Sequence, residues 1–306
     1  MRVAIIGGTG FVGRYIIDAL QAAGHSVSTM VRSGSESKLG STSQVRITNG
    51  DLQSQSAINT TCENCDAVIY NVGILRENSR RGETFEETQF RGVERTIAAA
   101  RNAGVKRFLL MSASGVRAGG TPYQDSKFRA EELVRNSGID YVIFRPSVIF
   151  GDPRNLTEIA TQLYEDMISP PLPAIGFHTG WNSTGGKVLM SPVHVEDVAR
   201  AIVLALHDER TLCQTIHLGG PETLSWPTMI ERVAAAAGKK KCIVPVPIVV
   251  MELVASILDW IPQFPVTRDQ LAMLAEGSVV EPDELMKLIG RDLRRFDAEN
   301  LSYLGG

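Results

Sequence analysis

A glycine-rich turn near the start of the chain constrains its fold more than any other feature. Gly7, Gly10 and Gly13 follow the apolar run Val3–Ile6 and precede a helical pattern that starts at Phe11. A buried strand, a glycine turn and a helix in this order are typical of a dinucleotide-binding βαβ unit. The turn is one residue longer than the G-x-G-x-x-G form. The three glycines serve the tight turn, the approach of a pyrophosphate and the packing of the helix on the strand.

The start of this helix is also the natural place for a phosphate group. Its first N–H groups have no partner within the helix, and the helix dipole puts partial positive charge there. We therefore expect the turn to bind the phosphates of a nicotinamide dinucleotide. The expected cofactor-binding residues of the turn are Gly7, Thr9, Gly10, Phe11, Val12 and Gly13.

Short apolar runs alternate with helical patterns through the first two thirds of the chain. This alternation predicts an α/β fold with a doubly wound parallel sheet, a Rossmann domain. We expect strands at residues 3–6, 26–31, 45–48, 67–71, 107–111, 141–145 and 215–218, and helices at 11–23, 85–103, 123–135 and 195–206.

The pattern predicts two parts of unequal size. The Rossmann domain comprises residues 1–151 and about 188–220, and a smaller, mostly helical substrate lobe comprises about 152–187 and 221–306. The prolines and glycines of 170–187 indicate a loop. An apolar stretch is interpreted as an amphipathic helix from Ile248 to Trp260. Because Glu252 and Asp259 interrupt it, we expect no transmembrane segment there.

Composition narrows the class of protein. With a net charge of −3, the 306-residue chain has no overall attraction for nucleic acid. Its four cysteines indicate no disulfide framework, and the first strand begins so early that we expect no signal peptide. Cys62 and Cys65 have metal-ligand spacing but lack a second pair, so we expect no metal site. A cytoplasmic protein is the expectation, with peripheral association with a membrane or a complex left open.

The end of the second expected strand bears on the choice of cofactor. NAD sites place a carboxylate there to accept a hydrogen bond from the ribose 2′-OH, but here the strand is followed by Arg32. Arginine pairs with a 2′-phosphate and stacks on adenine, so NADP(H) is favoured over NAD(H). Past the third strand, Asp51 and the Leu52 backbone are expected to meet the adenine edge.

Tyr123 and Lys127 form a candidate catalytic pair at the start of an expected helix. Their i, i+4 spacing puts both side chains on one helical face. The lysine cation would lower the tyrosine pKa and could also hold the nicotinamide ribose. The phenol could then exchange a proton with a substrate carbonyl or alcohol while hydride moves to or from the nicotinamide.

These motifs together resemble the short-chain dehydrogenase/reductase superfamily in its extended and atypical branches. The resemblance also draws on Arg145–Gly151 and Pro192–Val198, two blocks similar to the atypical group that includes the nucleotide-binding accessory subunit of respiratory complex I. It implies a Rossmann domain, a bound NAD(P)(H) and a C-terminal lobe that shapes a substrate pocket. Cofactor-binding residues added by the resemblance are Asn71, Val72, Gly73, Lys127 and Pro146.

The chain departs from the dehydrogenases of this superfamily in two catalytic positions. Those enzymes combine an Asn, a Ser or Thr, the Tyr and the Lys, and Gln89 stands at the Asn position here. The hydroxyl partner is Ser112 or Ser114. Two hypotheses follow. One is an NADP(H)-dependent oxidoreductase or epimerase acting on a sugar nucleotide, a quinone or isoprenoid-like molecule, or another carbonyl compound. The other is a non-catalytic NADPH-binding accessory or assembly protein.

Overall fold

The computed structural model describes residues 1–39, 45–179, 186–251 and 268–305. The chain forms two compact units, and each unit is built from three separate stretches of the sequence. Unit 1 comprises Met1–Pro146, Val195–His217 and Lys287–Gly290. Unit 2 comprises Ser147–His194, Leu218–Met286 and Arg291–Gly306. The first boundary falls directly after the strand that ends at Pro146.

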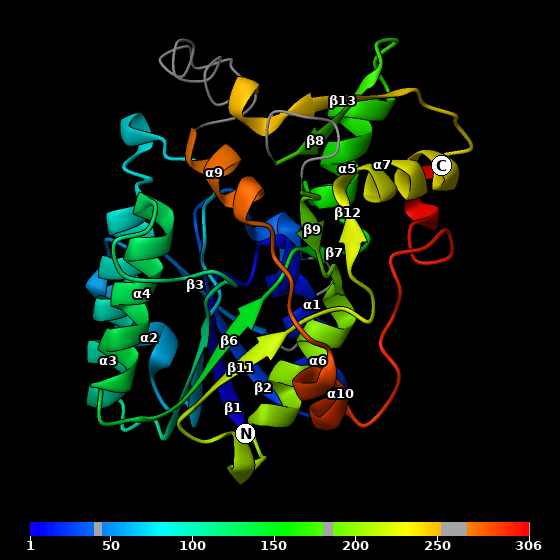
Figure 1. The fold of residues 1–306 in the computed structure, drawn as a ribbon. Coiled ribbons are helices and arrows are strands. Elements are labelled where there is room, and N and C mark those ends of the chain that lie inside the picture. Colours follow the sequence, from blue (N-terminus) through cyan, green and yellow to red (C-terminus); the bar gives the residue numbers. More distant parts are fainter. Residues whose placement is uncertain (40–44, 180–185, 252–267, 306) are drawn as a thin grey trace. The chain divides into compact units, whose positions relative to one another are not determined.

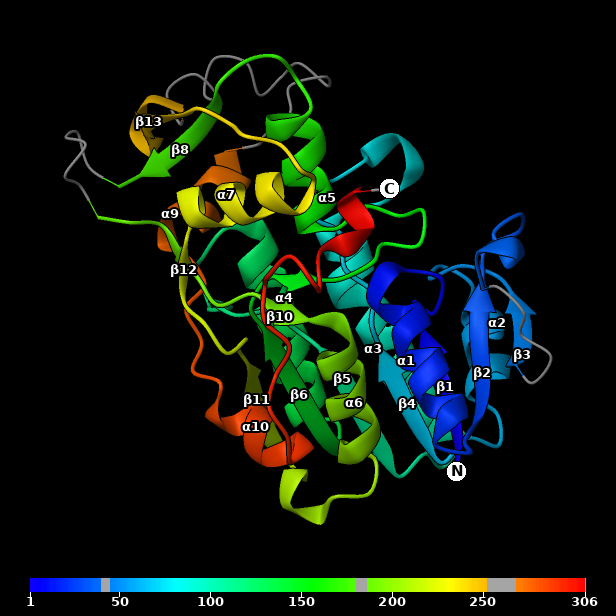
Figure 2. The same cartoon turned by 90° about the vertical axis from the view of Figure 1, so that its right-hand side faces the viewer.

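Unit 1 is built on a seven-stranded sheet, which confirms the predicted α/β class (Figures 1 and 2). The strand order reverses between β1 and β4, and the pairings β1–β2, β2–β3, β1–β4, β4–β5 and β5–β6 are parallel. Such a reversal creates the crevice in which doubly wound sheets bind ligands. Across the sheet the strands are β11 (Gln214–Leu218), β6 (Asp140–Pro146), β5 (Arg107–Met111), β4 (Ala67–Tyr70), β1 (Arg2–Ile6), β2 (Ser26–Val31) and β3 (Val45–Asn49).

Helices cover both faces of this sheet. The helices α1 (Phe11–Ala22) and α6 (Val195–Ala205) pack together on one face, and α2 (Gln55–Cys62), α3 (Gly92–Asn102) and α4 (Pro122–Arg135) lie on the other (Figure 1). The sequence pattern did not predict α2, whose eight residues are mostly polar. Its start is fixed locally, because the Ser54 side chain accepts a hydrogen bond from the Ala57 amide.

The helix predicted over 85–103 consists of a π-helical turn followed by an α-helix. A π-helical turn, η3 (Glu86–Arg91), precedes α3. Tyr70 packs closely against this junction. Its hydroxyl donates to the Thr88 carbonyl, and a Cβ on Gly92 would lie 2.1 Å from that hydroxyl, so only glycine fits there. π-turns inside helices often occur at functional sites.

A buried carboxylate joins α4 to the two strands beside it. The Glu131 side chain is fully buried and accepts hydrogen bonds from Arg145 of β6, Arg135 of α4 and Ser112 after β5. Burial by itself raises the pKa of Glu131, but the hydrogen bonds and charge of these partners hold the pKa below its usual value. The carboxylate therefore stays ionised, and it fixes the helix that carries Tyr123 and Lys127.

Unit 2 has its own apolar core and short strands. It includes Phe150, Phe177, Trp226 and Phe296, all of which are buried. Its strand pairs are β7 (Ile149–Phe150) with β10 (Val193–His194), β9 (Leu189–Met190) with β12 (Leu224–Ser225), and β8 (Ala174–His178) with β13 (Ile243–Pro247). Its helices include α5 (Ile159–Leu163), η4 (Tyr164–Ile168), α7 (Trp226–Ala236), α9 (Arg268–Glu276) and η6 (Ser302–Gly305); α10 (Asp283–Ile289) spans a boundary between the units. Short 3₁₀ turns elsewhere are η1 (Glu36–Leu39), η2 (Ser79–Arg81) and η5 (Glu209–Thr211).

The loop predicted over 170–187 is partly wrong, and the helix predicted over 248–260 can be compared with the structure only at its start. Residues 174–178 lie inside the stretch predicted as a loop, but they form β8, because parallel pairing with β13 satisfies their backbone groups. Of the helix predicted over 248–260, residues 248–251 are helical, and the remainder lies outside the described residues. Within the described ranges, no helix is long and apolar enough to cross a membrane.

The Glu131 network yields a stability prediction. The Glu131→Ala variant should lose about 3 kcal/mol of unfolding free energy, because two partly buried guanidinium groups lose their shared carboxylate. Chemical denaturation at neutral pH measures this loss. Because the native pKa is lowered, the carboxylate's stabilising contribution is present above its unfolded pKa and fades as the pH falls through its native pKa.

The control is Glu132→Ala, which removes a half-exposed carboxylate that pairs with Arg135. It should cost about 0–1 kcal/mol, as surface ion pairs do. Equal losses in the two variants would contradict the importance assigned to Glu131.

Candidate functional site

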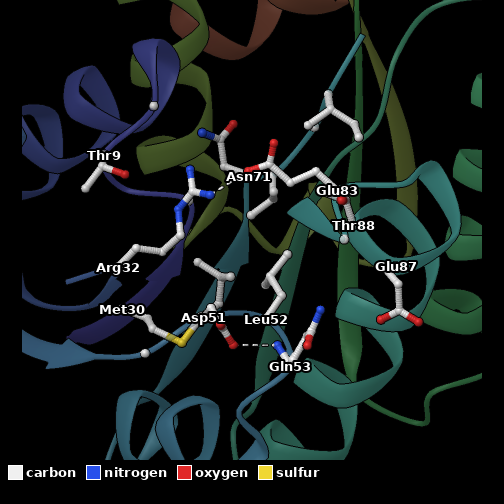
Figure 3. Close-up of a pocket in the computed structure, with 18 of the residues that line it drawn as sticks. Thr9, Met30, Arg32, Asp51, Leu52, Gln53, Asn71, Glu83, Glu87 and Thr88 are labelled. Carbon is white, nitrogen blue, oxygen red and sulfur yellow. Dashed lines mark hydrogen bonds and ion pairs between the residues drawn. The ribbon is translucent and has the colours of Figure 1, made fainter. Parts of the chain in front are cut away.

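A cavity of about 320 Å³ lies at the carboxyl ends of β1, β2, β3 and β4 in unit 1 (Figure 3). Parallel strands of a doubly wound sheet bind their ligands at this edge. Four of the segments that line the cavity contain predicted cofactor-binding residues. A fifth segment, the stretch before α3, contains none. The predicted residues in these segments are Gly7, Thr9, Gly10, Arg32, Asp51, Leu52, Asn71, Val72 and Gly73.

The glycine turn brings α1 very close to the end of β1. A Cβ on Gly13 would lie 2.2 Å from the Gly7 carbonyl oxygen, and a Cβ on Gly7 would lie 2.6 Å from the Asn71 carbonyl oxygen. Gly7 also has a φ of +94°, a conformation that other residues rarely adopt. Gly10 is the residue before α1, and no side chain caps the start of this helix. The geometry therefore leaves the helix start accessible to a phosphate.

Gly10 differs from its neighbours in what surrounds it. A Cβ there would meet only the Gly7 carbonyl oxygen, at 3.5 Å, which is an ordinary contact. The fold by itself therefore does not require glycine at this position. A pyrophosphate that approaches the backbone closely would require it.

The second and third strands supply the polar groups at the other end of the cavity. Arg32 directly follows β2, and its Nη1 lies 2.5 Å from Glu83 Oε1. Asp51 follows β3, and its Oδ1 accepts hydrogen bonds from the Gln53 and Ser54 amides at 3.0 and 3.1 Å. The Leu52 carbonyl accepts from Arg95 at 3.0 Å. One Asp51 oxygen and the Leu52 carbonyl are thus engaged within the protein.

Lys127 reaches from α4 to the segment after β4. Its Nζ donates to the Met111 carbonyl at 3.1 Å and lies 3.6 Å from the position that a Cβ on Gly73 would occupy. This ammonium group therefore lies beside Gly73, which lines the cavity, although Lys127 itself does not. Burial lowers the pKa of Lys127 to about 8, and the charge of Glu131 opposes that shift. The ammonium form therefore predominates at neutral pH.

Tyr123 lies one helical turn before Lys127, as the spacing predicted. Its side chain is buried, packs edge-to-face on Phe85 at 5.8 Å between ring centroids, and lies 5.7 Å from the Lys127 Nζ. The expectation that Lys127 lowers the tyrosine pKa is wrong for the free protein, because burial raises the pKa of the Tyr123 hydroxyl. At neutral pH this residue is the phenol, the form that can donate a proton.

The two candidate serines differ in what they contact. The Ser112 hydroxyl donates to Glu131 at 2.5 Å, so it belongs to the network that holds α4. Ser114 is half-buried, and its amide donates to the Pro146 carbonyl at 2.8 Å, which extends the pairing of β5 and β6.

Gln89 is buried within η3 and connects two segments of the site. Its Nε2 donates to the Ile74 carbonyl at 2.9 Å, and its Oε1 accepts from the Ser126 hydroxyl at 2.9 Å. Ser126 immediately precedes Lys127. Gln89 therefore ties the segment after β4 to the helix of the catalytic candidates.

Several predicted residues do not line the cavity, and several lining residues were not predicted. Phe11, Val12, Gly13, Lys127 and Pro146 are absent from the lining. The unpredicted residues come from buried strand ends and from a polar stretch without periodicity, so no pattern identified them. They include Met30, Gln53, Ile74, Arg81, Gly82, Glu83, Glu87 and Thr88.

These features fit a nicotinamide dinucleotide. The uncapped helix start and the glycine cradle suit a pyrophosphate, Arg32 and Asp51 suit an adenosine, and the ammonium beside Gly73 suits a ribose. The Cys62 and Cys65 thiols are in contrast buried in the core of unit 1, and burial raises the pKa of Cys62 to about 12.

The glycine turn provides a matched pair of substitutions. Gly10→Ala should leave the melting temperature within about 2 °C, yet weaken NADPH binding at least about tenfold, because its methyl group would occupy the space of the phosphates. Gly13→Ala should unfold at a clearly lower temperature, because its Cβ collides with the Gly7 carbonyl. Thermal unfolding and NADPH fluorescence titration separate the two effects. Unchanged NADPH binding in Gly10→Ala would contradict the expected phosphate position.

Known proteins resemble this chain along most of its length. The NADH-ubiquinone oxidoreductase 40 kDa subunit of Neurospora crassa is 26% identical over 98% of this chain and 77% of its own length. The ceramide reductase of Caulobacter vibrioides is 28% identical over 80% of this chain and 73% of its own. The Bordetella bronchiseptica enzyme WbmH, solved in complex with NAD⁺, shares the fold with a TM-score of 0.75, 17% identity and coverage of 99% and 96%.

A family model described as NAD(P)H-binding matches residues 7–169, more than half of the chain. The match begins in the glycine turn and continues past α4. The resemblance to extended short-chain dehydrogenases/reductases near the complex I subunit is thereby confirmed. The chain belongs to the NAD(P)H-binding family and binds a nicotinamide cofactor.

Proposed function

We propose that the protein is an NADP(H)-dependent reductase of carbonyl compounds in which Tyr123 is the proton donor. The observation that carries the proposal is the arrangement of Tyr123 and Lys127. One is a buried phenol, and the other is a buried ammonium one turn later that reaches Gly73 at the cavity's edge. Burial of a cation is costly, so a lysine buried at this point favours a functional role.

The bound cofactor supplies a hydride to the carbonyl carbon. As the carbonyl oxygen gains negative charge, the Tyr123 hydroxyl gives it a proton, so the carbonyl becomes an alcohol. The raised pKa of Tyr123 keeps the proton on the phenol before reaction, which suits reduction. Lys127 holds a ribose hydroxyl and stabilises the phenolate that forms.

The preference for NADP(H) is part of the proposal. Arg32 supports it, because this arginine lines the cavity where an NAD site would have a carboxylate on the second strand. Ser114 is the hydroxyl proposed to assist Tyr123, because Ser112 is committed to Glu131. The free thiols of the four cysteines suit a reducing compartment such as the cytoplasm.

The substrate class that we propose is an apolar ketone or quinone. The sequence from Ile243 to Ile261 is rich in apolar residues, whereas basic residues that would pair with a sugar diphosphate are sparse in the second half before Arg268. The relative named ceramide reductase also bears the name of a lipid substrate.

A second candidate function is the retention of NADPH without turnover, as a subunit or assembly protein of a larger complex. Three hydrogen bonds favour it. Gln89, at the family's Asn position, is bonded to Ser126 and the Ile74 carbonyl. Ser112, one of the two candidate hydroxyls, is bonded to Glu131. The relative named as a subunit of NADH-ubiquinone oxidoreductase is consistent with it.

Tyr123→Phe tests the reductase. Single-turnover oxidation of NADPH by a panel of apolar ketones and quinones should slow by about 10²–10⁴-fold, because the variant lacks the proton donor. NADPH affinity should change less than about threefold, since Tyr123 does not line the cavity. Tyr141→Phe, on the half-buried Tyr141 of β6, is the control and should react like the wild type. Tight NADPH binding with no turnover of any substrate would instead support the second candidate.

The lowered pKa of Lys127 predicts a pH dependence. The ammonium form is lost as the pH rises through about 8, so the single-turnover rate should fall by about tenfold per pH unit above it. Lys127→Arg retains its charge, so its slower rate should stay level between about pH 8 and 10. The same decline in both proteins would show that another group titrates.

A further inference from the structure

Arg32, the residue expected to bind the 2′-phosphate of the cofactor, already forms an ion pair with Glu83. Arg32 Nη1 lies 2.5 Å from Glu83 Oε1, and both residues line the 320 Å³ cavity (Figure 3). The Arg32 side chain is 67% exposed and that of Glu83 is 30% exposed. This ion pair therefore lies at the open side of the cavity, where a cofactor phosphate can compete for the guanidinium.

Glu83 reaches Arg32 from the other side of the cavity. It belongs to the 77–85 loop, the last part of the connection from β4 to η3, and hydrogen bonds within the loop hold its shape. The Asn78 amide donates to the Glu83 carbonyl at 2.7 Å, and the Glu83 amide donates to the Asn78 carbonyl at 3.1 Å. The Phe85 amide donates to Glu77 Oε1 at 2.6 Å.

The 77–85 loop also approaches the third strand's side of the cavity. Gly82 has a φ of +67°, and a Cβ there would lie 3.0 Å from Gln53 Nε2. Arg81, Gly82 and Glu83 all line the cavity. The loop thus places a carboxylate beside the residue that follows β2, although β2 itself ends without one.

A carboxylate at this place discriminates between the two nicotinamide cofactors. The ribose 2′-OH of NAD(H) donates a hydrogen bond to a carboxylate, and this is how the acid of NAD-specific sites acts. The 2′-phosphate of NADP(H) carries negative charge, so it attracts Arg32 but is repelled by Glu83. Glu83 and the phosphate cannot both occupy the same face of the guanidinium.

We propose that Glu83 is a specificity-determining residue of the cofactor site. Its carboxylate holds Arg32 in the free protein, accepts a hydrogen bond from the 2′-OH of NAD(H), and must be displaced by the 2′-phosphate of NADP(H). The chain therefore binds both cofactors, with a preference for NADP(H) that Glu83 reduces. This inference rests on the dinucleotide site of the proposed function but not on its catalytic residues.

Binding measurements on Glu83→Gln test the proposal. Dissociation constants for NADPH, NADH, adenosine 2′,5′-bisphosphate and AMP are measured by titration calorimetry at about 50 mM salt, where screening is weak. Glu83→Gln should bind NADPH and the bisphosphate about tenfold more tightly, because a like charge is removed. NADH and AMP should bind equally or slightly less tightly. The gain should shrink at about 0.5 M salt.

Two further variants complete the experiment. Arg32→Gln should weaken NADPH and bisphosphate binding at least about tenfold while changing NADH binding less than about threefold. Glu94→Gln, at an exposed glutamate on α3 that does not line the cavity, should bind all four ligands like the wild type. Circular dichroism confirms that each variant is folded.

The outcomes separate this inference from the proposed function. An unchanged ratio of NADPH to NADH affinity in folded Glu83→Gln overturns the role of Glu83, even if Arg32→Gln behaves as expected. If the ratio of NADPH to NADH affinity is unchanged in both variants, the role of Arg32 in binding the 2′-phosphate is overturned as well. A shifted ratio in a protein that reduces no carbonyl compound supports Glu83 while contradicting the reductase.

Discussion

The contact between Gly13 and Gly7 is the constraint on which the rest of the site depends. Because a Cβ on Gly13 would lie 2.2 Å from the Gly7 carbonyl oxygen, the two glycines let α1 begin directly against the end of β1. This approach leaves the helix start facing the cavity, with no side-chain cap. Many of the other residues that line the cavity follow neighbouring strand ends, and their positions follow from the parallel register of β4, β1, β2 and β3.

A second requirement, the fixing of α4, uses residues that were candidates for catalysis. Glu131 is buried and needs several donors, and Ser112 is one of them. Gln89 likewise joins Ile74 to Ser126. These contacts hold the helix that carries Tyr123 and Lys127, and they occupy Gln89, at the family's Asn position, and Ser112, one of the two candidate hydroxyls. The same contacts are why retention of the cofactor without turnover is a serious second function.

Much of the fold could be predicted because its signals are local. The strand of Val3–Ile6, the glycine turn and the Tyr123/Lys127 spacing each lie within a few residues, so periodicity and turn chemistry identify them. The predictions fail where a segment distant in the sequence determines the local structure. Residues 174–178 form β8 because β13, about 70 residues later, pairs with them. The eight-residue α2 has too few apolar positions to show a helical period.

The sequence by itself determined the Rossmann unit, the glycine turn before α1, the phenol and ammonium on one helical face, and an arginine after β2. The tertiary structure alone decided the partners of these groups. It placed Glu83 on Arg32 across 51 residues of chain and Ser112 on Glu131 across 19. Such pairs carry no local signature, since either residue alone is an ordinary polar side chain. Their chemistry arises when the fold brings the two charges, or the donor and acceptor, within hydrogen-bond distance.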